Sequence, residues 1–281
     1  LLQPVILDGK SLALKIREDL ARRVAALKAA GRPTPILATI LVGDDPASAT
    51  YVRMKGKATE QAGMESKRVE LPATTTTDQL LRIIGELNRD PAVSGILLQH
   101  PVPSQIDERL AFDTIDAGKD VDGVTTLGFG KISFGEEAYA SCTPGGMIRL
   151  MDEYELPIEG KHAVVVGRSP ILGKPMAMLL LQRNATVTIT HSRTQNLPDI
   201  LKEADIVVAA LGKPDFVRGE WLKEGVVVMD AGYNPGNVGD AHYESCAKKA
   251  SHITPVPGGV GPMTIAMLLA NTVESAEKQA G

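Results

Sequence analysis

The sequence predicts an α/β protein with two domains, each built on a parallel sheet covered by helices. Short apolar, β-branched runs alternate with longer amphipathic stretches along the chain, which is the pattern of βαβ units. A length of 281 residues suits two domains better than one. A glycine turn at Gly167 directly follows a buried run, as in the first turn of a Rossmann fold. We therefore expect a Rossmann-like C-terminal domain and an active-site cleft between the two domains.

Three strands and three helices are predicted in the first half of the chain. Apolar residues recur at intervals of three and four in the helical stretches. Ser11 and Thr77 are the predicted N-caps, because a hydroxyl can accept hydrogen bonds from the free amides of a first turn. The strands are expected at 35–43, 67–71 and 94–100, and the helices at 11–29, 48–62 and 77–87.

The second half predicts another parallel sheet. A glycine-rich stretch at 113–140 shows no sustained period and is predicted to be a long loop or interdomain crossing. A helix over 261–279 could return to the first domain. We therefore expect one domain from 1–140 plus 265–281 and a second domain over 141–264. The later strands are expected at 161–169, 185–193, 204–212 and 225–233.

The composition argues against several classes of partner. Only 4% of the residues are aromatic, and the formal net charge is -4 with Lys and Arg scattered along the chain, so we expect no nucleic-acid partner. No apolar run is long enough to span a bilayer, and the first residues lack the features of a secretory signal. Cys142 and Cys246 fit neither a disulfide framework nor a zinc site, so we expect a cytoplasmic protein with no metal.

The stretch VVVGRSPILGKPMAMLLL indicates a dinucleotide site. It places Gly167 between a strand and a helix, where Rossmann folds hold a pyrophosphate. A P-loop does not fit, because five residues separate Gly167 from Gly173 and a proline follows the lysine. Ser169 stands where the GxGxxG pattern has its second glycine, so a plain tight turn remains an alternative. We expect Gly167, Arg168, Ser169 and Gly173 to bind the cofactor.

The end of the next strand decides between NAD and NADP. NAD-specific folds carry Asp or Glu there, whereas this strand runs into Ser192 and Arg193. A carboxylate would repel a 2′-phosphate, but a hydroxyl and a guanidinium bind one through charge-assisted hydrogen bonds. Arg168 adds a second cation. We therefore predict NADP, and the alternative that Arg193 is a solvated loop residue stays open.

Candidate catalytic residues lie in the first half of the chain. Tyr51 and Lys55 are four residues apart on a predicted helix and share one face, although most helical lysines are simply solvated. An apolar strand ends at Gln99 and brings its amide to the carboxyl edge of the sheet, where α/β proteins bind ligands. Asp122 lies in the glycine-rich crossing as a possible anchor for a polar ring, and Asp120 is expected at the surface.

Seven motifs together resemble the bifunctional methylenetetrahydrofolate dehydrogenase/methenyltetrahydrofolate cyclohydrolase family over nearly the whole chain. They are YVRMK, GILLQHPVP, KDVDG, CTPGG, VVVGRSPILGKPMAMLL, ATVTITHSRT and ITPVPGGVGPMTIAMLL. The resemblance implies an enzyme that oxidises methylenetetrahydrofolate with NADP and hydrolyses the product to formyltetrahydrofolate, in one-carbon metabolism and purine biosynthesis. It also implies a homodimer that acts on tetrahydrofolate one-carbon derivatives. By this resemblance, 1–140 plus 265–281 form the folate-binding catalytic domain and 141–264 form the NADP-binding domain. We expect no formate-activating ligase activity.

The resemblance also implies roles for individual residues. Lys55 is similar to the family's catalytic lysine, with Tyr51 beside it, Gln99 as its partner and Asp122 on the pterin ring. The segment from Gly258 to Thr264 is expected to close the folate site. His100 and Gly128 depart from the family's pattern, which commonly has leucine and asparagine there, and this puts loop contacts in doubt. Substrate contacts are thus expected at Tyr51, Lys55, Leu98, Gln99, Asp122, Gly259 and Pro262, and a further cofactor contact at Tyr233.

The two implied reactions make different chemical demands. Hydride transfer needs the two bound partners to be aligned, without removal of a proton and without a metal. Hydrolysis needs a proton to be taken and another delivered, and Lys55 is the candidate, since burial beside a bound cation favours a neutral amine. Two other functions stay open. One is a different NADP-dependent dehydrogenase in which Lys55 polarises a carbonyl, and the other is a non-catalytic folate- or nucleotide-binding protein.

Overall fold

The computed structural model describes residues 3–279 and divides into two compact units, named here by their sheets. The six-stranded unit comprises the segment up to Leu14 together with Ser141–Thr264. The three-stranded unit comprises Lys15–Ala140 together with the residues from Ile265 onward. The segment before Leu14 was predicted with the first half. It groups instead with the second half because its strand pairs with the last strand of that sheet.

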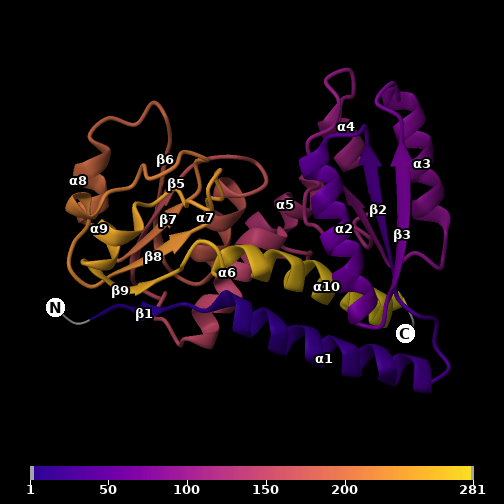
Figure 1. Ribbon diagram of the computed structural model, residues 1–281, viewed down its shortest axis with the longest axis horizontal. Helices are drawn as coiled ribbons and strands as arrows, with labels where there is room; N and C mark the ends of the chain where they lie inside the picture. Colours follow the sequence, from indigo (N-terminus) through magenta and orange to yellow (C-terminus); the bar gives the residue numbers. More distant parts are fainter. Residues whose placement is uncertain (1–2, 280–281) are drawn as a thin grey trace. The chain divides into compact units, whose positions relative to one another are not determined.

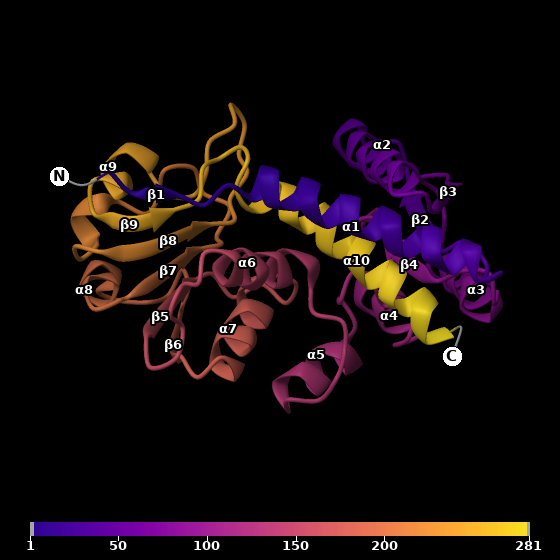
Figure 2. The ribbon, with the colours of Figure 1, turned by 90° about the horizontal axis from the view of Figure 1, so that it is seen from below.

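The six-stranded sheet is parallel throughout, in the order β1-β9-β8-β7-β5-β6 (Figure 2). The chain passes from β5 to β6 on one side and then to β7 on the other, so a topological switch point lies between β5 and β7. The predicted second parallel sheet is confirmed, but β1 and β9 were not predicted, because β1 has only two residues and β9 (ASHI) is half polar. The strands are β1 (Val5–Ile6), β5 (His162–Val166), β6 (Thr186–Thr190), β7 (Ile206–Ala209), β8 (Val226–Asp230) and β9 (Ala250–Ile253).

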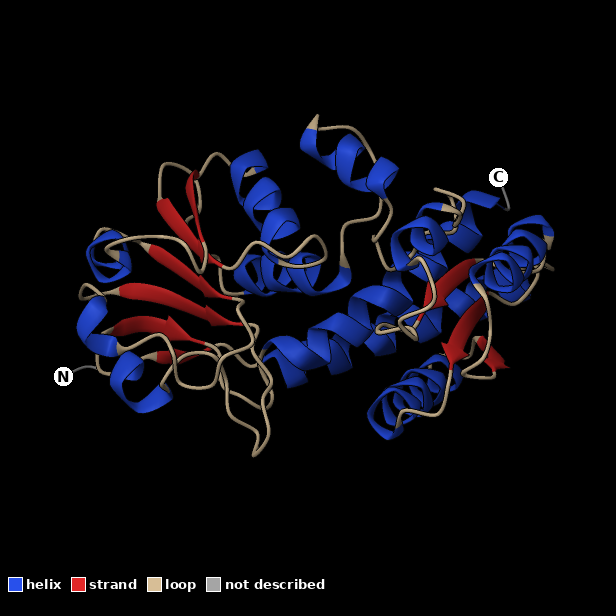
Figure 3. Ribbon diagram, turned by 90° about the horizontal axis from the view of Figure 1, so that it is seen from above, coloured by secondary structure: helices blue, strands red, loops and turns tan. Residues whose placement is uncertain are grey.

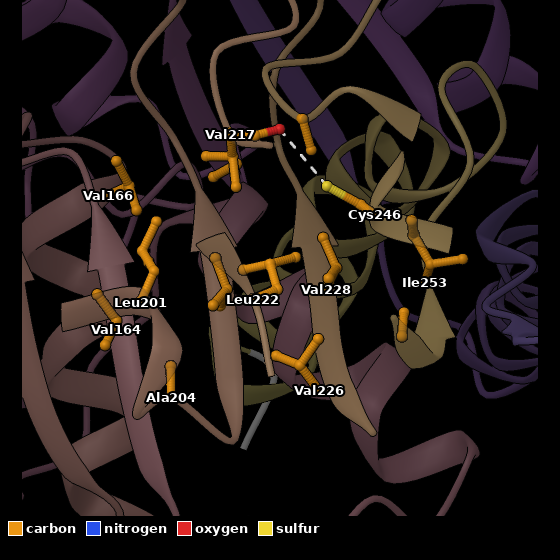
Figure 4. Packing of buried hydrophobic residues seen from close by; sticks show 14 residues of the cluster. Val164, Val166, Leu201, Ala204, Val217, Leu222, Val226, Val228, Cys246 and Ile253 are labelled. Carbon is orange, nitrogen blue, oxygen red and sulfur yellow. Dashed lines mark hydrogen bonds between the residues drawn. The ribbon is translucent and has the colours of Figure 1, made fainter. Parts of the chain in front are cut away.

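An apolar cluster covers one face of this sheet (Figure 4). Alternate strand residues such as Val164 and Val228 pack against Leu201 and Cys246 from two short helices. Fully burying one such aliphatic side chain contributes about 1.5–3 kcal/mol. The helix that follows β5 packs on β5 and β6, as βαβ connections require. The helices of this unit are α6 (Cys142–Glu153), α7 (Gly173–Gln182), α8 (Leu197–Lys202), the 3₁₀ turn η1 (Gly219–Trp221) and α9 (Tyr243–Ala247).

The three-stranded sheet is also parallel, in the order β3-β2-β4. Figure 1 shows β2 beside β3. Its switch point lies between β2 (Ile36–Val42) and β4 (Gly95–Leu98), because β3 (Glu65–Leu71) pairs on the far side of β2. One face packs against an apolar cluster that includes Ile84 of α3 and Phe112 of α4. The helices that lie wholly within this unit are α2 (Pro46–Gln61), α3 (Thr77–Arg89), α4 (Glu108–Asp113) and α5 (Thr126–Ser133).

The long helices match the prediction closely, whereas their caps do not. Helix α1 (Gly9–Ala29) begins after Asp8, whose carboxylate accepts from the amide of Ser11 at 3.0 Å. Thr76 caps α3, because its hydroxyl accepts from the amide of Gln79 and the Gln79 side chain accepts from the Thr76 amide. The predicted N-caps Ser11 and Thr77 are therefore wrong.

The stretch over 113–140 was predicted to be a loop, yet it contains the helix α5. The hydroxyl of Thr125 accepts from the amide of Gly128 and starts this helix. Two internal glycines lower the helical propensity of the stretch, so the sequence alone did not indicate it. The last helix, α10 (Val260–Gln279), was predicted and is confirmed. Figure 3 distinguishes the helices and strands by colour. None of the helices within residues 3–279 combines the length and hydropathy needed to span a bilayer.

Candidate active site

Lys55 and Gln99 meet at the switch point of the three-stranded sheet. The Nζ of Lys55 donates to Oε1 of Gln99 at 3.0 Å. Gln99 follows β4 directly and is only 9% exposed, and its backbone amide donates to the carbonyl of Ile40 at 2.9 Å. Its Nε2 donates to the carbonyl of His100 at 2.8 Å, which fixes the direction in which the amide points. The half-buried Lys55 nitrogen therefore faces an acceptor that carries no charge.

Helix α2 brings Tyr51 to the neighbourhood of Lys55. The carboxylate of Asp45 accepts from the amide of Ser48 at 2.7 Å and caps the helix, and Pro46 occupies the first turn, where its missing N–H costs nothing. Tyr51 lies one turn before Lys55 and is 41% exposed. An exposed aromatic ring beside a half-buried amine can stack on a flat ligand whose reactive atoms reach the amine.

Asp122 lies in a turn that is stabilised by hydrogen bonds to the side chain of Asp120. The carboxylate of Asp120 accepts from the amides of Val124 and Thr125, each at 3.0 Å. Asp120 is 2% exposed, so the prediction of a surface residue is wrong. Burial raises the pKa of the Asp120 carboxyl. The neighbouring Asp122 is half-buried at the surface of the turn, so its carboxylate can reach a ligand.

Side chains from other elements fix the same turn from outside. Nδ2 of Asn271 on α10 donates to the carbonyl of Val121 at 2.8 Å. The ammonium of Lys119 donates to the carbonyls of three residues at the end of α3 at 2.7–3.0 Å. A Cβ at Gly95 would lie 2.6 Å from a methyl carbon of Val121, so the turn packs directly on β4. Asp122 therefore has a fixed position within this unit.

Gly167 forms the turn at the switch point of the six-stranded sheet. Its φ is +138°, and a Cβ there would lie 2.0 Å from the carbonyl oxygen of Ala210, so no other residue fits. A Cβ at Gly173 would lie 2.3 Å from the carbonyl oxygen of Gly167, so α7 starts in close contact with the turn. The hydroxyl of Ser169 accepts from the amides of Leu172 and Gly173, at 3.2 and 3.3 Å. The geometry is that of a nucleotide-binding βα turn in which a serine helps to cap the helix.

Two arginines stand exposed near this turn. Arg168 follows Gly167, and Ser192 and Arg193 lie just beyond β6. Among the residues described, no carboxylate lies within ion-pair distance of the Arg193 guanidinium, which leaves it available to an anion. Tyr233 is 61% exposed after β8 and donates its hydroxyl hydrogen to Asn237 at 2.8 Å. These side chains all lie on the carboxyl side of the strands they follow.

Three further predicted residues have more limited roles in the structure. The side chain of Leu98 is 1% exposed within the apolar cluster, so only its backbone is available to a ligand. Gly259 and Pro262 belong to the six-stranded unit, at the start of α10. A Cβ at Gly259 would lie 2.6 Å from the carbonyl oxygen of Pro255, so this turn requires glycine.

Sequence reasoning missed two buried carboxylates at the same edge of the six-stranded sheet. Asp230 ends β8 and is 4% exposed, and Asp240 is fully buried. Asp230 accepts from the amides of Gly232, Asp240 and Ala241 at 2.8–2.9 Å. Asp240 lies in a polar, glycine-rich loop that has no periodicity. The position of Asp230 at a strand end was the one available signal for either residue.

Asp230 is expected to titrate well above a free aspartate. Burial raises the pKa of its carboxyl from 3.8 to about 6. Hydrogen bonds from three backbone N–H groups lower this pKa, and the charge of Asp240 raises it further. Because the folded state binds this proton more tightly than the unfolded chain does, protonation of Asp230 adds to the free energy of unfolding. This contribution is complete below pH 3.8 and is lost as the pH rises through about 6. Carbon-13 NMR of the carboxyl should give a midpoint near 6, and Asp240→Asn should lower it. A midpoint near that of a free aspartate would contradict this account.

Comparison with known proteins places these features in a family. Two family models match: the tetrahydrofolate dehydrogenase/cyclohydrolase catalytic domain over residues 7–122, and the NAD(P)-binding domain of the same family over residues 141–280. The bifunctional protein FolD of Shouchella clausii is 65% identical over 98% of this chain and 99% of its own length.

Solved structures agree with these matches. The structure of the bifunctional enzyme FolD from Campylobacter jejuni is 45% identical with a TM-score of 0.96, over 98% of this chain and 99% of that one. The methylenetetrahydrofolate dehydrogenase-cyclohydrolase of Trypanosoma brucei, solved with NADP cofactor and an inhibitor, is 38% identical with a TM-score of 0.94, over 100% and 99% of the two chains.

Proposed function

The chain belongs to the tetrahydrofolate dehydrogenase/cyclohydrolase family, and from this premise we propose how its own residues divide the family's two reactions. The enzyme oxidises methylenetetrahydrofolate to methenyltetrahydrofolate with NADP and hydrolyses the product to formyltetrahydrofolate. In our proposal the three-stranded unit binds the folate and carries the acid/base, and the six-stranded unit binds NADP. The observation that carries the proposal is the hydrogen bond from Lys55 to Gln99 at a sheet switch point.

The oxidation moves a hydride from the bridging carbon of methylenetetrahydrofolate to the nicotinamide. The product is a cation delocalised over two folate nitrogens, so no proton has to be removed. The protein therefore contributes alignment, which can lower such barriers by roughly 7–11 kcal/mol. Asp122 accepts from the N–H groups at the polar edge of the pterin, and Tyr51 stacks on the ring system. Both contacts fix the folate within the three-stranded unit.

The hydrolysis requires proton transfer, which we assign to Lys55. Water attacks the methenyl carbon and gives a proton to the neutral amine of Lys55. The resulting ammonium then delivers that proton to the ring nitrogen that leaves as the five-membered ring opens, which restores the neutral amine. The remaining hydroxyl proton passes to solvent as the formyl C=O forms, which accounts for the one proton that the overall hydrolysis releases. Oε1 of Gln99 accepts from the Lys55 nitrogen at 3.0 Å and orients it without adding a charge that would favour the ammonium.

The proposed cofactor site combines the Gly167 turn with the positive charges of Arg168 and Arg193. The turn of Gly167 and the start of α7 would hold the pyrophosphate, since helix N-termini favour anions. Ser192 and Arg193 bind the 2′-phosphate, with Arg168 as a second cation. Tyr233 lies beside the nicotinamide half. NADP is the cofactor whose extra phosphate matches a guanidinium in place of the carboxylate typical of NAD-specific sites.

Two absorbance assays test the proposed function. Methylenetetrahydrofolate with NADP should give reduced cofactor, and methenyltetrahydrofolate alone should lose its absorbance without cofactor. If the purified chain reduced NADP only with a hydroxy or amino acid, the function would be that of another NADP-dependent dehydrogenase. If it bound folate and NADP without turnover, it would be a binding protein, and either result would overturn the proposal.

We further propose a cytoplasmic homodimer. Cys142 and Cys246 are both buried as thiols, which suits a reducing compartment. Strand β1 forms one edge of the six-stranded sheet, and its Val5 and Ile6 are 45% and 41% exposed. An apolar edge strand is a surface that a second copy can cover. Light scattering should give twice the chain mass, and a monomer at micromolar concentration would contradict this assignment.

A further inference from the structure

The side chain of Asp240 accepts three hydrogen bonds within the six-stranded unit, as many as that of Asp230. Its Oδ2 accepts from the backbone amides of Leu211 and Gly212, both at 2.7 Å. Its Oδ1 accepts from Nδ2 of Asn234 at 3.0 Å. The carboxylate is fully buried, and no ammonium or guanidinium lies within ion-pair distance of it in the described part of the chain. A buried charge is tolerated there because three donors surround it.

These three donors come from two different loops. Leu211 and Gly212 follow β7, and Asn234 follows β8 immediately after Tyr233. Asn234 is itself fixed, because its Nδ2 also lies 3.2 Å from the carbonyl of Val238. One carboxylate therefore ties together the loops that leave two adjacent strands at the carboxyl edge of the sheet.

The loop after β7 also forms one wall of the glycine turn. The residue before Leu211 is Ala210, whose carbonyl oxygen occupies the space that a Cβ at Gly167 would need. A shift of this loop would therefore change the turn where the pyrophosphate is expected. The loop after β8 carries Tyr233, expected at the nicotinamide half.

We propose that Asp240 is a positioning residue that holds the β7 and β8 loops in the shape that accepts the nicotinamide half of NADP. This inference rests on the proposed function. Asp240 does not touch the cofactor itself. It acts through the backbone of Leu211 and Gly212 and through the side chain of Asn234.

The variant Asp240→Asn tests this with little change in volume. An amide can offer its oxygen to the two backbone amides, but its NH₂ group then meets the NH₂ group of Asn234. We expect the KM for NADP to rise roughly tenfold, which corresponds to about 1.4 kcal/mol. Hydrolysis of methenyltetrahydrofolate, measured without cofactor, should stay within about twofold. Binding of adenosine 2′,5′-bisphosphate, a probe of the Arg193 region alone, should also stay within about twofold.

Two further variants complete the test. Asn234→Ala removes one arm of the network and should raise the KM for NADP by a smaller factor. The matched control is Asp215→Asn, which changes a half-buried aspartate in the loop after β7. Asparagine tolerates the φ of +52° at this position, so the substitution should change neither activity.

The outcomes separate failure of the inference from failure of the proposed function. A wild-type chain without NADP-linked oxidation of methylenetetrahydrofolate would overturn the function itself. An active wild type together with an unchanged KM for NADP in Asp240→Asn would overturn the inference. Loss of both activities in Asp240→Asn would also overturn it, because the residue would then be needed for folding rather than for positioning.

Discussion

Replacing Lys55 with methionine should abolish hydrolysis while leaving both ligands bound. Methionine keeps most of the length of the side chain and removes the amine, so the proton acceptor and donor of the hydrolytic step is lost. General acid–base groups contribute about 10²–10⁴ in rate, and we expect a loss in that range for methenyltetrahydrofolate hydrolysis. Equilibrium binding of NADP and of a folate analogue should change by less than about threefold. Stopped-flow absorbance and fluorescence titration measure the two quantities.

The same substitution two residues away provides the control. Lys57 lies on α2 as well but is exposed, and nothing in our proposal assigns it a role. Lys57→Met should retain hydrolysis at the wild-type rate. If Lys55→Met hydrolysed methenyltetrahydrofolate at a rate near that of Lys57→Met, Lys55 would not be the acid/base.

Reversing the charge of Arg193 should change the choice of cofactor. The guanidinium is exposed after β6 and has no carboxylate partner among residues 3–279, so we expect its role to be binding of the 2′-phosphate. Arg193→Glu replaces an attraction of about 1.5–3 kcal/mol with a repulsion. We expect kcat/KM for NADP to fall roughly a hundredfold, since each 1.4 kcal/mol is a factor of about ten. The value for NAD should change by less than about threefold.

Arg218→Glu is the matched control, because Arg218 is an exposed arginine of the same unit that lies before η1. It should not alter the ratio of the two cofactors. The salt dependence gives a second check, because added salt should weaken NADP binding in the wild type more than in Arg193→Glu. Comparable steady-state efficiency with NAD and NADP in the wild type would show that Arg193 does not select the cofactor.

Local periodicity predicted most of the architecture. The helices α1, α2, α3 and α10 match the predicted ranges to within two residues at each end, because each carries a sustained pattern that depends on neighbours in sequence. Strand β1 has two residues, Val5 and Ile6, and its existence depends on pairing with residues near 252, which no local pattern encodes. The caps failed for a related reason. Asp8 lies three residues before Ser11, and Thr76 lies one residue before Thr77. The backbone conformation determines which of these side chains accepts from the first-turn amides.

The sequence predicted which residues belong to the candidate site, but it did not predict which of them contact one another. Tyr51 and Lys55 follow from helical spacing, and Gln99 from the end of an apolar strand. Their convergence depends on the order of three strands, because Lys55 and Gln99 are 44 residues apart. The burial of Asp120 could not be predicted, because it arises when the turn folds back on its own amides. The role of Asp240 likewise depends on loops from two strands that meet only in the sheet.

The most direct measurement is a crystal structure of the chain with NADP and a tetrahydrofolate analogue that cannot be hydrolysed. Our account predicts the Lys55 nitrogen within about 3.2 Å of the attacking water or of the nitrogen that leaves, with Gln99 still accepting from it. The 2′-phosphate should lie on Arg193. A folate ring bound away from Lys55, with the amine turned into solvent, would contradict the central claim.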